Sequence, residues 1–363
     1  MRLGVEAALV GGRLMPGDVS VADGRVEAVG LGSGGSGIAA PGFVDLQVNG
    51  FAGVDLMATD REGYAHVGEA LLATGTTAFQ PTFVTAPEAA LLDALRAMPA
   101  GGIGPRVLGA HVEGPFLSPR RAGVHDARYL SAPDLALLRR LLDAAPVSQV
   151  TLAPELPGAF ELIDELVARG ITVSAGHTDA TAAEAHLAFD RGVSTVTHLF
   201  NAMRASTARD PSIALSALAR PDVVVQLIVD LHHVAPDTVM VAWNAADGRF
   251  VLVTDAAPAA GMGDGEFVLG GRTITAEDGV VRGPEGQLAG SALTMIEGVR
   301  NLTSLGVALE DALRAASEVP ARVARRADLG RLEPGAAADV VVLDDRLEVL
   351  RVLVEGRDRV ARA

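Results

Sequence analysis

Apolar runs alternate with Ala- and Leu-rich helical segments along most of the chain. Eight runs rich in β-branched residues follow one another at 43–49, 76–83, 107–114, 149–155, 172–178, 195–201, 224–231 and 250–257. The helical segments between them include 131–145, for which Ser131 is the expected N-cap, and 180–191. Alternating strands and helices predict a parallel sheet, and eight such units within about 250 residues are typical of a (β/α)8 TIM barrel. A doubly wound open sheet is the alternative fold.

The two ends of the chain have a different pattern. Residues 11–30 and 330–360 contain short strands separated by Gly, Pro and Asp turns. We therefore expect a small β-sandwich domain formed by 1–41 together with 329–363, joined by a flexible crossing at 31–40 to a catalytic barrel at 42–328. The Gly-rich stretch 261–290 predicts a β-hairpin insertion near 262–288, after the eighth strand.

Composition narrows the classes of function. The net charge is −15, which argues against nucleic acid or an anionic membrane as the main partner but leaves room for a local basic site for an anionic small molecule. There is no Cys, and all 30 basic residues are Arg, so thiolate sites, Schiff-base lysines and metal pairs bridged by a carboxylated lysine are excluded. The first residues lack a signal-peptide pattern and no run of about 18 apolar residues follows, so we expect a cytoplasmic protein.

Polar residues gather at the carboxyl ends of the predicted strands, which form one mouth in a TIM barrel. They are Gln47, Asn49, Glu113, Glu155, His177, His198, Asp230, His233 and Asp255. Glu113, His177 and His198 would give a divalent ion three ligands and leave a position for water, as in catalytic zinc sites. Such an ion lowers the pKa of its water from about 15.7 towards about 7. Asp255 could then take the proton of that water and pass it to a leaving group, although an aspartate here could also cap a helix or serve as a fourth ligand.

Five motifs resemble those of the amidohydrolase superfamily and, within it, the N-acetylglucosamine-6-phosphate deacetylases. They are "HVEGPFLSPRRAGVHD" (111–126), "SAGHTDAT" (174–181), "THLFNAM" (197–203), "LVTDAAPAAG" (252–261) and "LAGSALTM" (288–295). The similarity extends from residue 41 to residue 344 in the order of the family. The resemblance implies a TIM barrel with a small β domain, and hydrolysis of the acetamide of N-acetylglucosamine 6-phosphate to glucosamine 6-phosphate and acetate.

The resemblance also assigns roles to individual residues. It implies that Glu113, His177 and His198 hold one divalent ion per subunit, with Zn²⁺ expected and Fe²⁺, Co²⁺ or Mn²⁺ able to share such ligands. It makes Asp255 the general base and acid. The residues expected to contact the substrate are His125, Asn201, Ala202, Arg209 and His233.

Two of these substrate contacts have alternatives nearby. Arg209 matches an arginine that reaches the phosphate from a neighbouring subunit in the family, which implies a homodimer, but the usual flanking glycines are missing and Arg204 is the alternative. His232 precedes His233, so either of the two histidines could face the substrate.

Gln47 and Asn49 occupy a position that carries a His-x-His pair in many amidohydrolases, where the pair binds a second metal ion. Some deacetylases of the family have Gln-x-Asn there, as this chain does. Neutral amides are poor zinc ligands beside imidazole. We therefore expect a single ion, with Gln47 and Asn49 hydrogen-bonding the bound water or the substrate.

Other interpretations of the sequence remain. The substrate could be N-acetylgalactosamine 6-phosphate, an unphosphorylated N-acetyl sugar or an N-acyl amino acid. The chain could also be a metal-free amidohydrolase-like scaffold, although its intact set of expected ligands argues against that. His111 is expected to be either a partner of the site or a buried barrel histidine, while His66 and His186 are expected to have no catalytic part.

Overall fold

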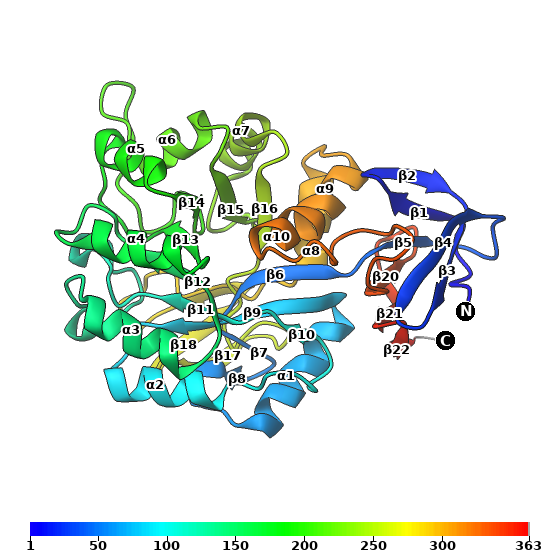
Figure 1. Ribbon diagram of the computed structural model, residues 1–363, viewed down its shortest axis with the longest axis horizontal. Coiled ribbons are helices and arrows are strands. Elements are labelled where there is room, and N and C mark those ends of the chain that lie inside the picture. Colours follow the sequence, from blue (N-terminus) through cyan, green and yellow to red (C-terminus); the bar gives the residue numbers. More distant parts are fainter. Residues whose placement is uncertain (362–363) are drawn as a thin grey trace.

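The eight apolar runs form the eight parallel strands of a barrel. The structure, a computed structural model, describes residues 1–361 (Figure 1). In spatial order the barrel strands are β6 (Phe43–Val48), β9 (Thr76–Val84), β11 (Ala110–Glu113), β12 (Val147–Leu152), β13 (Thr172–Ala175), β14 (Val193–Val196), β15 (Val224–Ile228) and β16 (Phe250–Val253). Each strand pairs in parallel with the next along this order, from β6 to β16. The predicted TIM barrel is confirmed.

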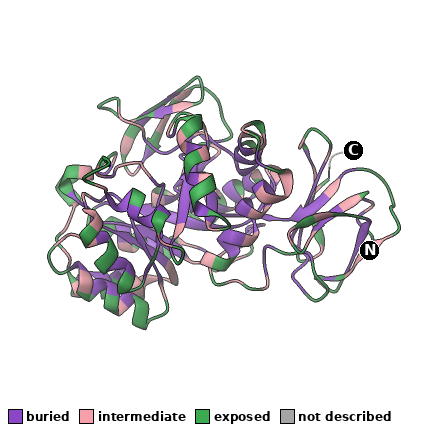
Figure 2. Cartoon of the chain, turned by 90° about the horizontal axis from the view of Figure 1, so that it is seen from above, coloured by how far each residue is buried: buried purple, intermediate pink, exposed green. Residues whose placement is uncertain are grey.

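Helices cover the outside of the barrel (Figure 1). They are α1 (Arg61–Ala73), α2 (Glu88–Ala97), α3 (Leu135–Ala144), α4 (Ala159–Ala168), α5 (Ala182–Asp190), α6 (Ile213–Ala219), α7 (Pro236–Ala246), α8 (Met295–Ser304), α9 (Leu309–Ala316) and α10 (Glu318–Val323). Figure 2 shows buried residues along the strands and exposed residues on the outer faces of the helices. Among residues 1–361, no helix has the length and apolar character needed to cross a membrane.

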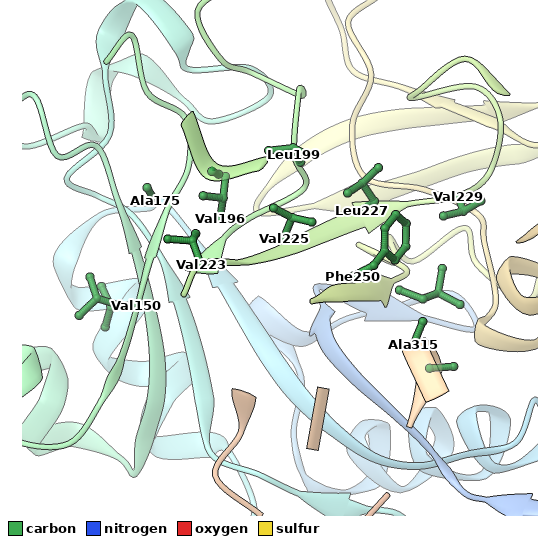
Figure 3. Packing of buried hydrophobic residues seen from close by; sticks show 14 of the residues in the cluster. Val150, Ala175, Val196, Leu199, Val223, Val225, Leu227, Val229, Phe250 and Ala315 are labelled. Atoms are coloured by element: carbon green, nitrogen blue, oxygen red, sulfur yellow. The ribbon is translucent and has the colours of Figure 1, made fainter. Parts of the chain in front are cut away.

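The barrel strands pack against the helices through alternate residues. On β15, Val225 and Leu227 belong to the apolar cluster between strands and helices, as do Val196 on β14 and Phe250 on β16 (Figure 3). Gln226, between the two β15 residues, points the other way and donates to the Thr195 hydroxyl at 3.0 Å inside the barrel. This period of two is what a strand requires when its two faces meet different surroundings.

Side chains close the seam of the barrel between β6 and β16. The two strands are joined by an isolated parallel bridge, Val48 to Ala256, instead of a continuous ladder. The carboxylate of Asp45, fully buried on β6, accepts hydrogen bonds from the Thr254 hydroxyl at 2.5 Å and the Thr254 amide at 3.3 Å. Burial raises the pKa of Asp45 to about 7. The seam therefore rests on a buried carboxyl group held by its neighbour strand.

Several element boundaries differ from the sequence prediction. The run at 107–114 is divided into β10 (Arg106–Val107) and β11 by Leu108 and Gly109, which has φ of 93°. The helix expected at 131–145 starts at Leu135, and Asp134 caps it by accepting from the amides of Ala136 and Leu137 at 2.8 and 3.0 Å. Ser131 is not the cap, because Pro133 disfavours helical backbone in the residue before it.

Both chain ends contribute to one small β unit beside the barrel, as predicted (Figure 1). Its six-stranded sheet has the order β2 (Arg13–Pro16), β1 (Ala7–Val10), β5 (Ile38–Pro41), β20 (Val340–Leu343), β21 (Val349–Val354), β22 (Arg357–Ala361). The hairpin of β3 (Asp18–Ala22) and β4 (Arg25–Leu31) packs Val19 and Val26 against Val340 and Val342 of that sheet. The division of the chain at 41/42 and 328/329 stays a prediction.

Two connecting segments are more ordered than expected. The crossing predicted at 31–40 is a loop only at 32–37, because β4 continues through Leu31 and β5 begins at Ile38. The insertion after β16 is a three-stranded antiparallel sheet of β17 (Gly265–Leu269), β18 (Arg272–Glu277) and β19 (Val280–Arg282), one strand more than the expected hairpin. A short strand pair, β7 (Gly50–Phe51) and β8 (Val54–Asp55), follows β6.

Candidate active site

A cavity of about 250 Å³ lies at the carboxyl ends of the barrel strands. Most of the residues predicted for the site line it: Asn49, Glu113, His125, His177, His198, Asn201, Ala202, His233 and Asp255. The mouth of the barrel thus brings together side chains that are more than 200 positions apart in the sequence, such as Asn49 and Asp255. Gln47 lies behind the lining, fully buried.

Glu113, His177 and His198 converge on one point. The Oε1 atom of Glu113 is 3.0 Å from Nε2 of His198 and 3.3 Å from Nε2 of His177, and the two Nε2 atoms are 3.1 Å apart. Ligand atoms bound at 2.0–2.1 Å in a tetrahedral zinc site stand about 3.3 Å from one another. The observed triangle has nearly these dimensions, so the three side chains fit a small divalent cation.

Hydrogen bonding prepares the imidazole of His177 as a ligand. Its Nδ1 lies 2.9 Å from the carbonyl oxygen of Arg121, which can only accept, so Nδ1 carries the proton. In the neutral form of the ring, the lone pair of Nε2 is then directed at Glu113 and His198. A lone pair facing a carboxylate is repulsive without a cation between them, which supports the fit to a metal ion.

A second trio of ligand atoms shares two members with the first. Glu113, His125 and His177 each offer a ligand atom within 4.8 Å of the other two. His125 is the more distant member, with Nε2 3.8 Å from Glu113 Oε2. Its Nδ1 accepts from the amide of Thr85 at 3.2 Å, so the proton of its neutral ring is on Nε2, and that nitrogen is a donor. The trio with His198 is therefore the better fit to an ion.

The environment of His125 keeps its ring neutral. Burial, together with the neighbouring His177, lowers the pKa of His125 to about 3. At neutral pH the Nε2–H group is therefore a hydrogen-bond donor without a net charge, directed into the cavity beside Glu113. Such a donor suits a carbonyl oxygen on which negative charge develops.

Gln47 and Asn49 each hold one of the two carboxylates of the site. The amide nitrogen of Gln47 donates to Glu113 Oε2 at 3.2 Å, and the amide nitrogen of Asn49 donates to Asp255 Oδ1 at 2.7 Å. Their amide oxygens are buried and have no hydrogen-bond partner within residues 1–361. The two amide oxygens are therefore free to accept a hydrogen bond from water or a substrate hydroxyl. The two amide nitrogens hold the carboxylates in place.

Asp255 is a buried carboxyl group with an unusual proton affinity. Burial, and next the charge of Glu113, raise the pKa of Asp255 to about 6, while the hydrogen bond from Asn49 opposes the shift. Its side chain lines the cavity beside the three expected ligands. A carboxyl group whose pKa lies near neutrality can both accept and return a proton.

The strands end before the functional residues, and the chain bends there. β13 ends at Ala175, β14 at Val196 and β16 at Val253, two residues before His177, His198 and Asp255 respectively. These three residues have positive φ of 48°, 31° and 51°. Left-handed backbone is uncommon outside glycine and is concentrated at functional sites, where the surrounding structure maintains it. Here it turns each side chain across the mouth.

The expected substrate contacts divide into two groups. His233 lines the cavity and its Nδ1 is 2.6 Å from Asp230 Oδ2, whereas His232 is exposed. Asn201 and Ala202 also line the cavity. Arg209 is exposed and does not line it.

Arg204, the alternative to Arg209, belongs to a neighbouring cavity. There it pairs with Asp210, its Nη2 being 2.5 Å from Asp210 Oδ2. Among the residues described, neither arginine of this loop therefore reaches the active-site cavity within its own subunit.

The insertion contributes lining residues that the sequence prediction missed. Leu269 at the end of β17, and Gln287 and Leu288 after β19, complete the wall of the cavity. The sequence signals for them were the position of the Gly-rich stretch directly after the eighth strand, at the rim where catalytic loops lie, and, for Leu288, its place at the start of the motif 288–295.

His111 is a buried barrel histidine. Its Nδ1 donates to the Leu46 carbonyl oxygen at 3.2 Å and its Nε2 is 2.7 Å from the Thr151 hydroxyl. Burial lowers the pKa of His111 to about 4, so the ring is neutral. The Thr151 hydroxyl is in turn 2.7 Å from that of Thr197, which makes the barrel interior below the site polar.

Comparisons with known proteins agree with this geometry. Residues 38–358 match the amidohydrolase family. The chain belongs to the amidohydrolase family. Among the relatives of this amidohydrolase, the human N-acetylglucosamine-6-phosphate deacetylase is 38% identical over 341 residues, 89% of this chain and 83% of the relative. An N-acetylgalactosamine-6-phosphate deacetylase from Escherichia coli O157:H7 is 35% identical over 325 residues, 87% of this chain and 86% of the relative.

Solved structures of the same enzymes have the same fold as this amidohydrolase. A mutant N-acetyl-D-glucosamine-6-phosphate deacetylase from Mycobacterium smegmatis, in complex with N-acetyl-D-glucosamine-6-phosphate, superposes with a TM-score of 0.95 at 34% identity, over 99% of both chains. The N-acetylglucosamine-6-phosphate deacetylase from Thermotoga maritima gives a TM-score of 0.92 at 29% identity, over 100% of both chains.

We predict that Gln47→Leu weakens metal binding by about 10- to 100-fold, because it removes the donor that fixes Glu113 Oε2. The affinity is measured by competition with a chromogenic chelator. Gln287→Leu, a substitution of the same type in the cavity wall, is the control and should bind metal like the parent protein. Equal affinities for Gln47→Leu and the parent would show that the Gln47 amide does not orient the ligand.

Proposed function

We propose that this amidohydrolase removes the acetyl group of N-acetyl-D-glucosamine 6-phosphate, giving D-glucosamine 6-phosphate and acetate. The observation that carries the proposal is the triangle of Glu113, His177 and His198 beside the buried Asp255. The family match and the names of the relatives support the substrate. We place the reaction in the cytoplasm, the compartment of amino-sugar catabolism that the resemblance implies.

Glu113, His177 and His198 would hold one divalent ion, for which we propose Zn²⁺. When bound, such an ion supplies a strong nucleophile from water at neutral pH and neutralises developing negative charge. Gln47 and Asn49 offer two buried amide oxygens to hydrogen atoms of water or substrate. A second ion at this position is disfavoured because neutral amides replace imidazoles there.

Asp255 moves the proton in the proposed reaction. An amide has a poor leaving group, since the departing amine must be protonated as the C–N bond breaks. Asp255 takes a proton from the attacking water and returns it to the amine nitrogen, and its raised pKa allows both transfers. The bond from Asn49 keeps the carboxylate in one orientation throughout.

His125 assists at the carbonyl of the acetamide. Its Nε2–H donates toward the position where the carbonyl oxygen gains negative charge, and the Thr85 amide at Nδ1 keeps that proton in place. Positioning of the rest of the substrate falls to His233, Asn201 and Ala202 on the opposite loops.

The phosphate needs a cation that this subunit does not place in the cavity. The chain has no lysine, and the lining of the cavity, as far as the described residues go, contains no arginine. We propose that the protein is a homodimer in which Arg209 of each subunit reaches the phosphate bound by its partner. An exposed arginine on a loop is suited to this task, because its planar fork can hold two phosphate oxygens.

N-acetylgalactosamine 6-phosphate is a second candidate substrate. The bacterial relative named for it is 35% identical over 87% of this chain, within the range of the glucosamine enzymes. The two sugars differ only in the orientation of the C4 hydroxyl.

The first test measures acetate release after removal and return of metal. Protein stripped with a chelator is given zero, one or two equivalents of Zn²⁺ and assayed with N-acetylglucosamine 6-phosphate, its galacto epimer and unphosphorylated N-acetylglucosamine. We expect activity to reach its plateau at one equivalent and to be highest with the phosphorylated gluco sugar. A requirement for two ions would refute the single-ion proposal, and no turnover of any substrate would favour a scaffold protein.

The second test separates Asp255 from metal binding. Asp255→Asn should retain the parent metal content, measured by mass spectrometry, and lose turnover by about 10³-fold because the amide cannot accept the proton. Asp264→Asn, an exposed carboxylate of the insertion, is the matched control and should turn over like the parent. Normal turnover by Asp255→Asn would remove Asp255 from its assigned role.

The third test asks whether Arg209 acts across the dimer. Asp255→Asn and Arg209→Gln subunits with different tags are co-expressed and the hybrid is purified. If Arg209 acts across the dimer, one site of the hybrid combines the native Asp255 of one subunit with the native Arg209 of the other, and the second site lacks both. The hybrid should therefore recover about half of the parent activity per dimer. A hybrid of Asp255→Asn with Glu113→Gln is the control and should stay inactive, because each defect lies in its own subunit's site. An inactive Arg209 hybrid would contradict action in trans.

A further inference from the structure

A second cavity lies away from the active site. It measures about 510 Å³ and is bounded by Gly11 and Gly12 in the turn between β1 and β2, by Pro41, and by the segment from α9 to residue 333. Figure 1 shows α9 and α10 next to β1 and β2, at the junction of the barrel and the β unit. Pro41 lies two residues before the start of β6, and the active site lies beyond the end of the same strand. The two cavities therefore lie at opposite ends of β6.

Guanidinium groups dominate the lining of this cavity. Five arginines and two glutamates line it, and we call it the arginine cavity: Arg314, Arg322, Arg325, Arg326 and Arg331, with Glu318 and Glu333. This balance is the reverse of the chain as a whole, which has 45 acidic and 30 basic residues. Arginine is always protonated, so the positive charge of the cavity is permanent.

Two of the five arginines are not neutralised by carboxylates. Arg314 and Arg326 form ion pairs of 2.8 Å with Glu318 and Asp328, and Arg331 pairs with Glu333 at 3.5 Å. Within residues 1–361, Arg322 and Arg325 form no ion pair, and the one side-chain bond of Arg322 is a 2.8 Å contact from Nη2 to the carbonyl oxygen of Gly248. Their guanidinium groups are therefore available to an external anion.

The backbone of Arg325 is unusual for such a residue. It follows α10 at the position where helices commonly end in a left-handed glycine, and its φ is 56°. The amide of Arg326 donates to the carbonyl of Ala321 at 2.9 Å, which completes this type of helix end. Glycine would adopt the conformation without strain, so the arginine side chain is present despite a backbone cost.

A favourable interaction with the helix dipole accounts for only part of the cluster. Arg322 and Arg325 lie at the carboxyl end of α10, where cations are stabilising. Arg314 lies on α9 and Arg331 lies in the segment after α10. The dipole at the carboxyl end of α10 therefore explains the position of neither residue. The convergence of arginines from separate elements on one cavity is what favours an anion there.

We propose that the arginine cavity binds a small molecule that carries a phosphate dianion, at a site separate from the active site. A guanidinium fork matches two oxygens of a phosphate group, and a dianion balances the charge of the two arginines that have no ion pair. The volume is in the range of small-molecule sites, about 300–1,000 Å³, and exceeds what free phosphate needs. The bound molecule would join the β1–β2 turn to the α9–α10 segment.

The test is calorimetric titration of the metal-loaded protein with inorganic phosphate and with glycerol 3-phosphate, at constant ionic strength. We expect saturable binding that weakens at least tenfold in Arg322→Gln/Arg325→Gln. The control Arg96→Gln/Arg139→Gln removes the same charge from exposed positions on α2 and α3 and should bind like the parent. Acetate release by each variant without added ligand should equal that of the parent, which shows that the fold is kept.

The variant Arg325→Gly removes the guanidinium group without destabilising the fold, because glycine suits the left-handed position. It therefore tests binding even if the double glutamine variant does not fold. We expect it to unfold at the same temperature as the parent or higher, and to bind glycerol 3-phosphate less tightly. Binding of the ester alone assigns an organic phosphate, and equal binding of both probes assigns free phosphate. Unchanged affinity in Arg325→Gly and in the double glutamine variant, or equal weakening in the control, would overturn the proposal.

Discussion

Three electron-rich atoms held within about 3.3 Å of one another are the constraint on which this site is built. The lone pair of His177, the imidazole of His198 and the carboxylate of Glu113 repel one another unless a cation lies between them. The barrel maintains this arrangement through parallel strands that end together, a proton on the far side of His177 and left-handed bends after β13 and β14. Packing below the mouth therefore keeps the three atoms in an arrangement that fits a cation.

The amides at the end of β6 have a task in addition to the one predicted from the sequence. Gln47 and Asn49 take the place of metal-binding histidines in related proteins, yet their nitrogens hold carboxylates, one on Glu113 and one on Asp255. Two neutral residues thereby orient both carboxylates of the cavity. Hydrogen bonding to water or substrate is left to their free oxygens.

Much of the fold and of the site composition could be predicted from the sequence, because both follow from local pattern. Apolar runs with a period of two predict the strands. Polar residues at the carboxyl ends of these strands predict which side chains line the mouth of the barrel. The orientation of Asn49 toward Asp255 could not be predicted, since it depends on closure of the barrel across 206 positions. The bends at His177 and Asp255 could not be predicted either, because most His and Asp residues have negative φ even though both types are enriched at positive φ.

The seam between β6 and β16 links the integrity of the barrel to its chemistry. Where other neighbouring strands are stitched by main-chain ladders, this junction relies on the Asp45 carboxyl group and Thr254. Asn49 lies four residues after Asp45, and Asp255 directly follows Thr254. The side chains that close the cylinder are therefore chain neighbours of Asn49 and Asp255, so separation of these two strands would disturb the orientation of the carboxyl group that we propose as the proton carrier.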